Sequence, residues 1–234
     1  MAARTNPYEG EELRAVCGET LRPGGLAVTR DALEFCHFRP GARLLDVGCG
    51  PGGTLKFLKE MGYEAVGVEK SPLLAAEARA QGPVWEADFH HLPLADNWAE
   101  GLVAECVLSL ALDPEQALAE WGRVLQPGGR LILSDVILKD GAAPLPPATD
   151  SGCLAGAVTL TTLINRLERG GYALVHQRDY GQAWRELAAQ LVWRYGSADI
   201  LRQLWAREAG DSCGCFRGRD FTYGLLIAQK EEQP

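Results

Sequence analysis

The chain has 234 residues, a formal net charge of −8 at pH 7 and seven cysteines. This length accommodates one α/β domain, and the acidic charge argues against a nucleic acid partner, which requires a basic surface. The sequence contains neither an apolar run long enough to span a membrane nor an apolar signal segment, so we expect a cytoplasmic protein without membrane contact. Scattered cysteines in an odd number favour free thiols over a disulfide framework.

Strand and helix signals alternate up to residue 137, which predicts a parallel sheet with helices on both faces. The predicted strands cover residues 43–47, 64–69, 83–87, 101–108 and 131–137. A predicted helix at 53–61 follows the first strand, and another follows the second strand, capped by Ser71 and continuing to about residue 81.

Beyond residue 138 the pattern changes. A loop rich in proline, alanine and glycine covers 141–152, and a helix at 158–169 ends before two glycines. We expect further strands at 172–177 and 221–229. Between them lies a helical stretch at 182–208, broken near Gly196 and Ser197, whose apolar face comprises Trp184, Leu187, Leu191, Leu201, Leu204 and Trp205.

The most informative motif is the glycine turn after the first strand, where Asp46 stands two residues before Gly48. A G-x-G turn lets the backbone approach a bound nucleoside, but a dinucleotide would place its pyrophosphate at the following helix N-terminus, where Asp46 repels it. S-adenosylmethionine (SAM) carries a sulfonium and an ammonium instead of phosphates, and a carboxylate stabilises both. The motif therefore favours SAM.

Two alternatives stay open on this segment alone. Gly48, Gly50 and Gly53 also satisfy the G-x-G-x-x-G dinucleotide pattern, and Glu69 follows at about the spacing of a ribose-binding acid. An NAD-dependent oxidoreductase therefore remains a rival. A glycine turn that joins a strand to a helix without any ligand is the other reading.

Acids follow three successive strands of the predicted sheet. Asp46, Glu69 and Asp88 stand at the carboxyl ends of the first, second and third strands. Because ligands of open α/β sheets bind beyond these ends, we expect the three carboxylates to line one site. They would take the ammonium, the ribose hydroxyls and the adenine amino group of SAM.

These residues resemble the class I SAM-dependent methyltransferases of the methyltransferase type 11 kind. The resemblance covers about residues 40–137 and rests on the segments at 44–52, 66–71, 87–94 and 123–135. It implies a Rossmann-like α/β sheet of seven strands in the order 3-2-1-4-5-7-6, with strand seven antiparallel and helices on both faces. The cofactor-binding residues it implies are Asp46, Gly48, Cys49, Gly50, Glu69, Lys70, Asp88, Phe89 and Glu105.

The same resemblance implies transfer of the SAM methyl group to a small-molecule or soft-atom acceptor, with S-adenosylhomocysteine (SAH) as product and no resident metal. It further implies a single domain, with an N-terminal helical cap over 1–40, a SAM-binding core over 41–138, and a substrate-side part over 139–234. No catalytic residue is assigned. Tyr8 and Arg22 fall in the N-terminal part that covers the active site in this family.

A narrower resemblance concerns the acceptor. Residues 151–158 are similar to the segment around a substrate-binding cysteine of arsenite methyltransferases, which makes Cys153 a candidate, with Cys213 or Cys215 as a second thiolate for a soft atom. Thr54 and Leu55 stand where that family has a further cysteine. The alternative to substrate binding is that Cys153 is a packing residue, because a buried free cysteine behaves as a small hydrophobic side chain.

A third function class is a SAM-binding or protein-interaction module without turnover. The Trp-rich helices at 182–208 would then serve as the docking face for a second copy or another protein. SAM binding without methyl transfer to any thiol, metalloid or metabolite would favour this class.

Overall fold

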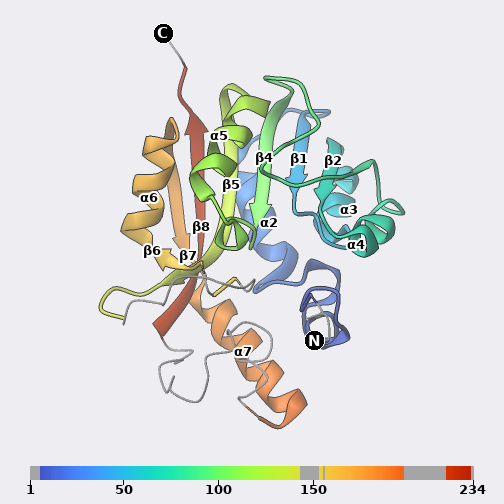
Figure 1. The fold of residues 1–234 in the computed structure, drawn as a ribbon, viewed down its shortest axis with the longest axis vertical. Coiled ribbons are helices and arrows are strands. Elements are labelled where there is room, and N and C mark those ends of the chain that lie inside the picture. The colour runs from blue at the N-terminus through green and yellow to red at the C-terminus, as the bar shows by residue number, and fades with distance from the viewer. Residues whose placement is uncertain (1–5, 143–152, 155, 198–219, 233–234) are drawn as a thin grey trace.

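The computed structural model describes residues 6–142, 153–154, 156–197 and 220–232. Its sheet has the strand order β3-β2-β1-β4-β5-β8-β7, and the short β6 pairs with β5 off this path. The strands are β1 (Arg43–Val47), β2 (Glu64–Glu69), β3 (Val84–Glu86), β4 (Ala99–Glu105), β5 (Leu125–Leu138), β6 (Val158–Thr159), β7 (Tyr172–Asp179) and β8 (Phe221–Lys230) (Figure 1).

Helices precede and connect these strands. They are α1 (Glu11–Cys17), α2 (Gly25–Cys36), α3 (Gly53–Glu60), α4 (Pro72–Ala78), α5 (Pro114–Val124), α6 (Leu160–Arg169) and α7 (Gly181–Tyr195), with the 3-10 helices η1 (Gly18–Thr20) and η2 (Leu108–Leu110). The expected cap of α4 is confirmed, since the Ser71 hydroxyl accepts the Leu74 N–H at 3.2 Å.

The predicted sheet topology is confirmed. Strands β1 to β5 pair in parallel, whereas β8 is antiparallel to both of its neighbours, β5 and β7. Strand β8 is therefore the seventh strand of the expected order. The short β6, which pairs Ile137 with Val158, was not predicted, and the helix expected from residue 158 begins after it.

A left-handed backbone conformation determines where one strand and one helix end. Strand β4 ends at Glu105 rather than at residue 108, because Cys106 adopts a left-handed φ of 57° and η2 follows. Helix α7 ends at Tyr195, at the break predicted near Gly196 and Ser197, because Gly196 forms a left-handed C-cap with φ of 72°. The rest of the expected 182–208 helical stretch, beyond residue 197, lies outside the described residues.

The core occupies both faces of the sheet. Leu44 and Ile132 belong to a cluster that includes residues of α2, α3 and α7, whereas their strand neighbours Leu45 and Leu131 belong to a second cluster with residues of α5 and α6. This alternation follows from the two-residue period of a strand. The expected helices on both faces are thereby confirmed.

Trp184, Leu187 and Leu191 of α7 are buried in the first of these clusters. These side chains therefore pack within the chain and are not available to a partner. The apolar side chain of α7 that remains most exposed is Trp193, at 88%.

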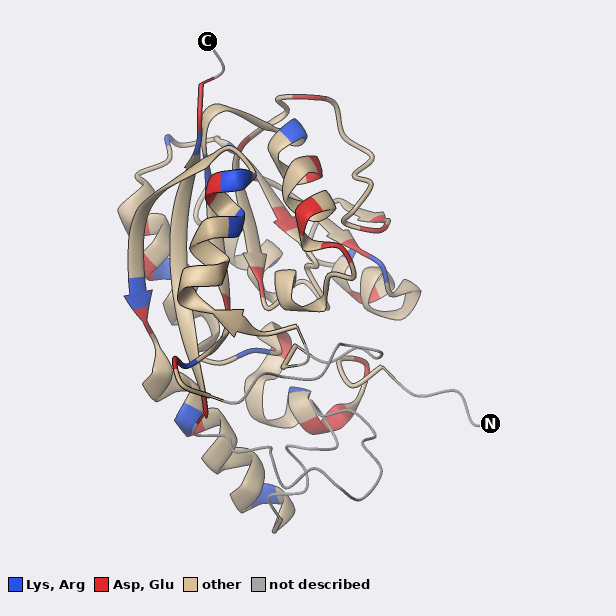
Figure 2. Cartoon of the chain, turned by 60° about the vertical axis from the view of Figure 1, so that its left-hand side comes forward, with Lys and Arg blue, Asp and Glu red and all other residues tan. Residues whose placement is uncertain are grey.

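Charged residues of both signs are dispersed over the described elements, with no gathering of Lys and Arg on one of them (Figure 2). Among the described residues, no helix combines the length and apolar character that a membrane span requires.

Candidate cofactor and acceptor site

The glycine turn after β1 has a backbone that other residues adopt only with strain. Gly48 and Gly50 have φ of 64° and 53°, in the left-handed region that favours glycine. A Cβ at position 48 would lie only 2.6 Å from Cγ2 of Val107. The sequence therefore requires glycine here to keep the backbone of the turn close to the end of β4.

Asp46 is buried at the end of β1, with 3% of its surface exposed, and its Oδ2 has no hydrogen-bond partner among the described residues. Burial raises the pKa of Asp46 well above its ordinary value, Glu105 raises it further, and Arg22 lowers it in part. A buried acceptor without a donor is costly. Asp46 is therefore suited to a ligand that brings a positively charged donor.

Glu69 joins the glycine turn to the loop after β2. Its Oε2 accepts the Gly50 N–H at 2.9 Å and its Oε1 accepts the Ser71 N–H at 2.8 Å. Burial raises the pKa of Glu69, although these backbone hydrogen bonds oppose the shift. A carboxylate has about four acceptor positions, so two remain for the hydroxyls of a ligand.

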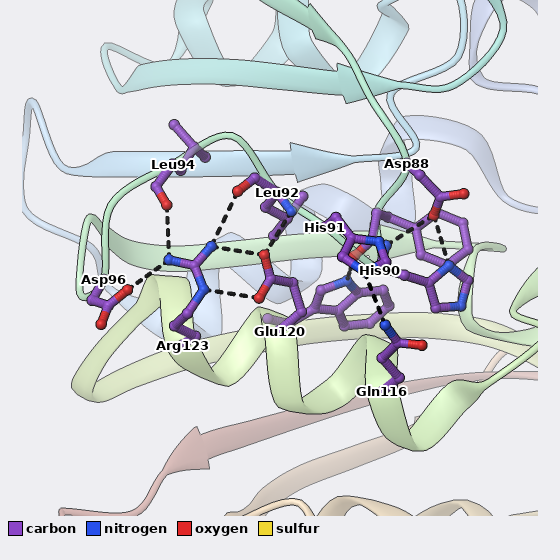
Figure 3. Close-up of polar contacts among 11 residues, drawn as sticks. Asp88, His90, His91, Leu92, Leu94, Asp96, Gln116, Glu120 and Arg123 are labelled. Carbon is purple, nitrogen blue, oxygen red and sulfur yellow. Dashed lines mark hydrogen bonds and ion pairs between the residues drawn. The ribbon is translucent and has the colours of Figure 1, made fainter.

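Asp88, just beyond β3, is held by two basic side chains. Lys70 Nζ lies 2.7 Å from its Oδ2. His90 Nδ1 lies 2.6 Å from its Oδ1 (Figure 3). Burial raises the pKa of Asp88, but the hydrogen bonds from Lys70 and His90 outweigh it and hold the pKa below its ordinary value. Asp88 is therefore ionised and fixed in orientation.

Side chains of helix α5 hold the 88–96 segment in place through hydrogen bonds to its backbone. Arg123 Nη1 donates to the Leu94 carbonyl oxygen at 2.8 Å, and Trp121 Nε1 donates to the Phe89 carbonyl oxygen at 3.2 Å (Figure 3). These bonds satisfy carbonyl groups of a segment without regular secondary structure. The position of the segment thus depends on α5.

Glu105, at the end of β4, forms a buried ion pair with Arg22. The Nη2 and Oε2 atoms are 2.6 Å apart, and the two side chains are 3% and 4% exposed. Thr29 and Thr54 donate to the same carboxylate at 2.9 Å and 3.0 Å. Burial lowers the pKa of Arg22, but Glu105 together with Tyr223, Cys106 and Asp46 outweighs it and raises the pKa above its ordinary value, so the guanidinium stays charged.

Two buried thiols, one buried tyrosine and the buried hydroxyl of the half-buried Tyr8 form a group that we call the thiol cluster (Tyr8, Cys106, Cys153 and Tyr223). The Cys106 thiol lies 3.7 Å from the Tyr223 hydroxyl. The Tyr8 hydroxyl is buried beside Cys153 and lowers its pKa, yet makes no hydrogen bond of normal geometry among the described residues. Burial nevertheless raises the pKa of Cys153 to about 12. Cys213 and Cys215 lie outside the described residues.

The structure thus links the expected residues in pairs: Gly50 with Glu69, and Lys70 with Asp88. We call Asp46, Gly50, Glu69, Asp88 and Glu105 the strand-end site. Cys49 is buried and its thiol packs against the sheet, with a raised pKa caused by burial. Thr29, which donates to Glu105, could not be predicted from the sequence because it belongs to no motif.

Comparison with known proteins agrees with this geometry. Residues 45–133 match a family model described as a methyltransferase domain. The chain is 32% identical over 207 residues to demethylmenaquinone methyltransferase of Mycolicibacterium paratuberculosis, a match that covers 88% of this chain and 81% of the relative. It is also 32% identical over 158 residues to arsenite methyltransferase of Halobacterium salinarum, which covers 60% of this chain and 40% of that relative.

A solved structure shares the fold. Phosphoethanolamine N-methyltransferase 2 of Haemonchus contortus, in complex with SAM, superposes with a TM-score of 0.71 at 16% identity, covering 95% of this chain and 56% of that chain. The chain belongs to the class I SAM-dependent methyltransferases. The oxidoreductase alternative is therefore not supported. The chain spans 33% to 55% of the length of the first curated relatives it matches.

Proposed function

We propose that this chain is a SAM-dependent methyltransferase whose cofactor occupies the strand-end site. Asp46 takes the methionine ammonium, Glu69 the ribose hydroxyls and Asp88 the adenine amino group, and the Phe89 backbone borders the adenine ring. The observation that carries the proposal is the unpartnered, buried Oδ2 of Asp46, because an ammonium donor satisfies this acceptor.

The rest of the strand-end site fits the same group. The backbone of Gly48, Cys49 and Gly50 borders the ligand, and Lys70 fixes Asp88. When bound, SAM supplies an electrophilic methyl group, so the protein's task is to orient the acceptor and exclude water. We assign the exclusion of water to the N-terminal cap, whose described residues include Glu19, packed against the start of α3: the Glu19 carbonyl oxygen lies 2.6 Å from where a Cβ at Gly53 would stand.

We propose a soft atom, a thiol or a trivalent metalloid, as the acceptor, held at Cys153. Support comes from the thiol cluster, where the Tyr8 hydroxyl lies beside Cys153 and a second thiol, Cys106, interacts electrostatically with it, and from the relative named an arsenite methyltransferase. Thiols that bind such a centre lose their protons to water, and binding offsets the raised pKa. The thiols must be reduced, which accords with a cytoplasmic location.

Calorimetric titration with SAH tests the cofactor assignment. The wild type should bind, and the double variant Glu69→Ala with Asp88→Ala should lose affinity on the order of 100-fold, because two charge-assisted contacts are removed. The variant Glu86→Ala is the control, since this acid of β3 pairs with Arg79 near the surface. No binding by the wild type, or unchanged binding by the double variant, discards the assignment.

Arsenite titration tests the acceptor, with intrinsic tryptophan fluorescence as readout. Cys153→Ser should weaken binding on the order of 10-fold or more, because a hydroxyl is a poor ligand for a soft centre. Cys36→Ser, a buried cysteine of α2, is the matched control. The double variant Cys213→Ser with Cys215→Ser should also bind arsenite more weakly. Equal affinity of wild type and Cys153→Ser rejects the metalloid.

A further inference from the structure

Arg22 is buried, with 5% of its surface exposed, and one of its donors is unused. Its Nη1 donates to the Thr20 carbonyl oxygen at 3.2 Å, and its Nη2 lies 2.6 Å from both Glu105 Oε2 and Thr29 Oγ1. The Nε atom has no partner among the described residues. A buried donor without an acceptor costs free energy. A ligand that brings an acceptor to this N–H would remove the cost.

The backbone around Arg22 lies directly on the glycine turn. A Cβ at Gly50 would stand 3.8 Å from Cδ1 of Leu21, and one at Gly53 would stand 2.6 Å from the Glu19 carbonyl oxygen. Arg22 follows these residues in the chain, and its charge lowers the pKa of Asp46. Arg22 and Asp46 therefore belong to the same end of the strand-end site.

The two residues offer unpaired groups of opposite polarity. Arg22 offers a cationic N–H at Nε, and Asp46 offers a carboxyl oxygen at Oδ2, which a neighbouring ammonium would keep ionised. Both side chains are more than nine-tenths buried. A ligand that carries a carboxylate and an ammonium on one carbon satisfies both groups at once, and an α-amino acid has this form.

The charges agree with this ligand. Asp46, Glu105 and Arg22 together carry a net charge of −1 when the two acids are ionised. The methionine end of SAM carries a carboxylate, an ammonium and a sulfonium, and thus a net charge of +1. Opposite net charges attract strongly where burial limits screening by water and salt.

We infer that Arg22 binds the carboxylate of the methionine part of SAM through its Nε–H, while Asp46 Oδ2 binds the ammonium. This inference rests on the proposed function and adds a residue to it. Arg22 is then a specificity residue for the amino-acid end of the cofactor. Glu105, Thr29 and Thr54 are positioning residues, because they hold the guanidinium through Nη2 or through the Glu105 carboxylate.

The test compares three ligands by calorimetry. These are SAH, the analogue 5′-(3-aminopropylthio)-5′-deoxyadenosine, which lacks only the carboxylate, and 5′-methylthioadenosine, which lacks the whole amino-acid end. The wild type should bind SAH on the order of 10-fold to 100-fold more tightly than the aminopropyl analogue, as expected for a charge-assisted hydrogen bond. This comparison needs no variant. Equal affinities for SAH and the aminopropyl analogue overturn the inference.

Two variants assign the effect to Arg22. Arg22→Lys keeps a cation for Glu105 but loses the planar fork. It should bind SAH on the order of 10-fold more weakly and bind the aminopropyl analogue and 5′-methylthioadenosine as the wild type does. The control Arg14→Met removes another ion pair of the N-terminal part, with Glu77 at 2.8 Å, and should change none of the three affinities.

The outcomes separate the inference from the proposed function. If Arg22→Lys weakens all three ligands equally, or none, the carboxylate contact is wrong while the cofactor assignment stands. If the wild type binds none of the three ligands, both are wrong. The rise in melting temperature that 5′-methylthioadenosine causes in each variant shows whether the part of the site that binds adenosine is intact.

Discussion

The indole Nε1 of Trp121 donates a hydrogen bond of 3.2 Å to the carbonyl oxygen of Phe89. Trp121 is fully buried on α5, and the two rings meet edge to face with their centres 6.1 Å apart. One side chain thus fixes both the backbone and the ring of the residue after Asp88. Helix α5 thus determines the position of the residue beside Asp88, at the end of the strand-end site that we assign to adenine.

Trp121→Phe should therefore weaken SAH binding several-fold and lower the free energy of unfolding by about 1–3 kcal/mol, because a buried carbonyl loses its donor and a small cavity forms. Calorimetry and urea unfolding measure the two effects. The control Trp98→Phe concerns a partly buried ring that stacks with Arg43 at 5.7 Å, and it should leave SAH affinity unchanged. Unchanged SAH affinity in Trp121→Phe would contradict the positioning role.

Arg123→Met should loosen the 88–96 segment. The guanidinium donates to the carbonyl oxygens of Leu92 and Leu94 and pairs with Glu120, which accepts the Leu92 N–H at 2.6 Å. We expect hydrogen exchange of the Leu92 amide to accelerate and SAH to bind several-fold more weakly. Arg166→Met of α6 is the control, because Arg166 pairs at 3.3 Å with Glu115, which lies on α5 as Arg123 does. Equal exchange rates of Leu92 in wild type and Arg123→Met would refute the prediction.

Gly48→Ala should destabilise the protein by more than the strain of a left-handed backbone alone, which is about 1–2 kcal/mol. The added Cβ would also meet Val107 at 2.6 Å. Gly196→Ala provides a matched control, since Gly196 has a left-handed backbone with φ of 72° and nothing within 4 Å of its added Cβ. Urea unfolding should show the larger loss in Gly48→Ala, together with loss of SAH binding. A loss no greater than that of Gly196→Ala would rule out the clash.

Asp46→Asn should stabilise the free protein above mildly acidic pH while weakening SAH binding on the order of 10-fold. Burial raises the pKa of Asp46 above its unfolded value, so the folded state binds the proton more tightly. The wild type therefore loses stability as pH rises from the unfolded pKa, about 3.9, through the raised folded pKa. Asp46→Asn should lack this loss. Urea unfolding from pH 4 to 8 measures it, and identical pH profiles would speak against an ionised, unpartnered Asp46.

The strand-end acids were predictable because local patterns carry them. An apolar strand, a glycine turn and an acid at the strand end are all readable within ten residues, and β1 and β2 begin and end where predicted. The end of β4 was not readable, because the left-handed backbone of Cys106 depends on tertiary contacts, among them the 3.7 Å approach of its thiol to Tyr223.

The pairing of Arg22 with Glu105 joins residues that are far apart in the sequence, and no local pattern predicts such a contact. Thr54 shows the same limit. It stands where the arsenite methyltransferases have a cysteine, and only the structure shows that its hydroxyl donates to Glu105 at 3.0 Å. Local patterns thus predicted which acids stand at the strand ends, and the tertiary structure showed which residues contact them.

The cofactor assignment is tested most directly by a crystal structure of the chain with SAH. We predict density for the amino-acid end between Asp46 and Arg22, the ribose against Glu69, and the adenine beside Asp88 and Phe89. SAH bound elsewhere on the chain, or an adenine pointing toward Cys153, would contradict the assignment.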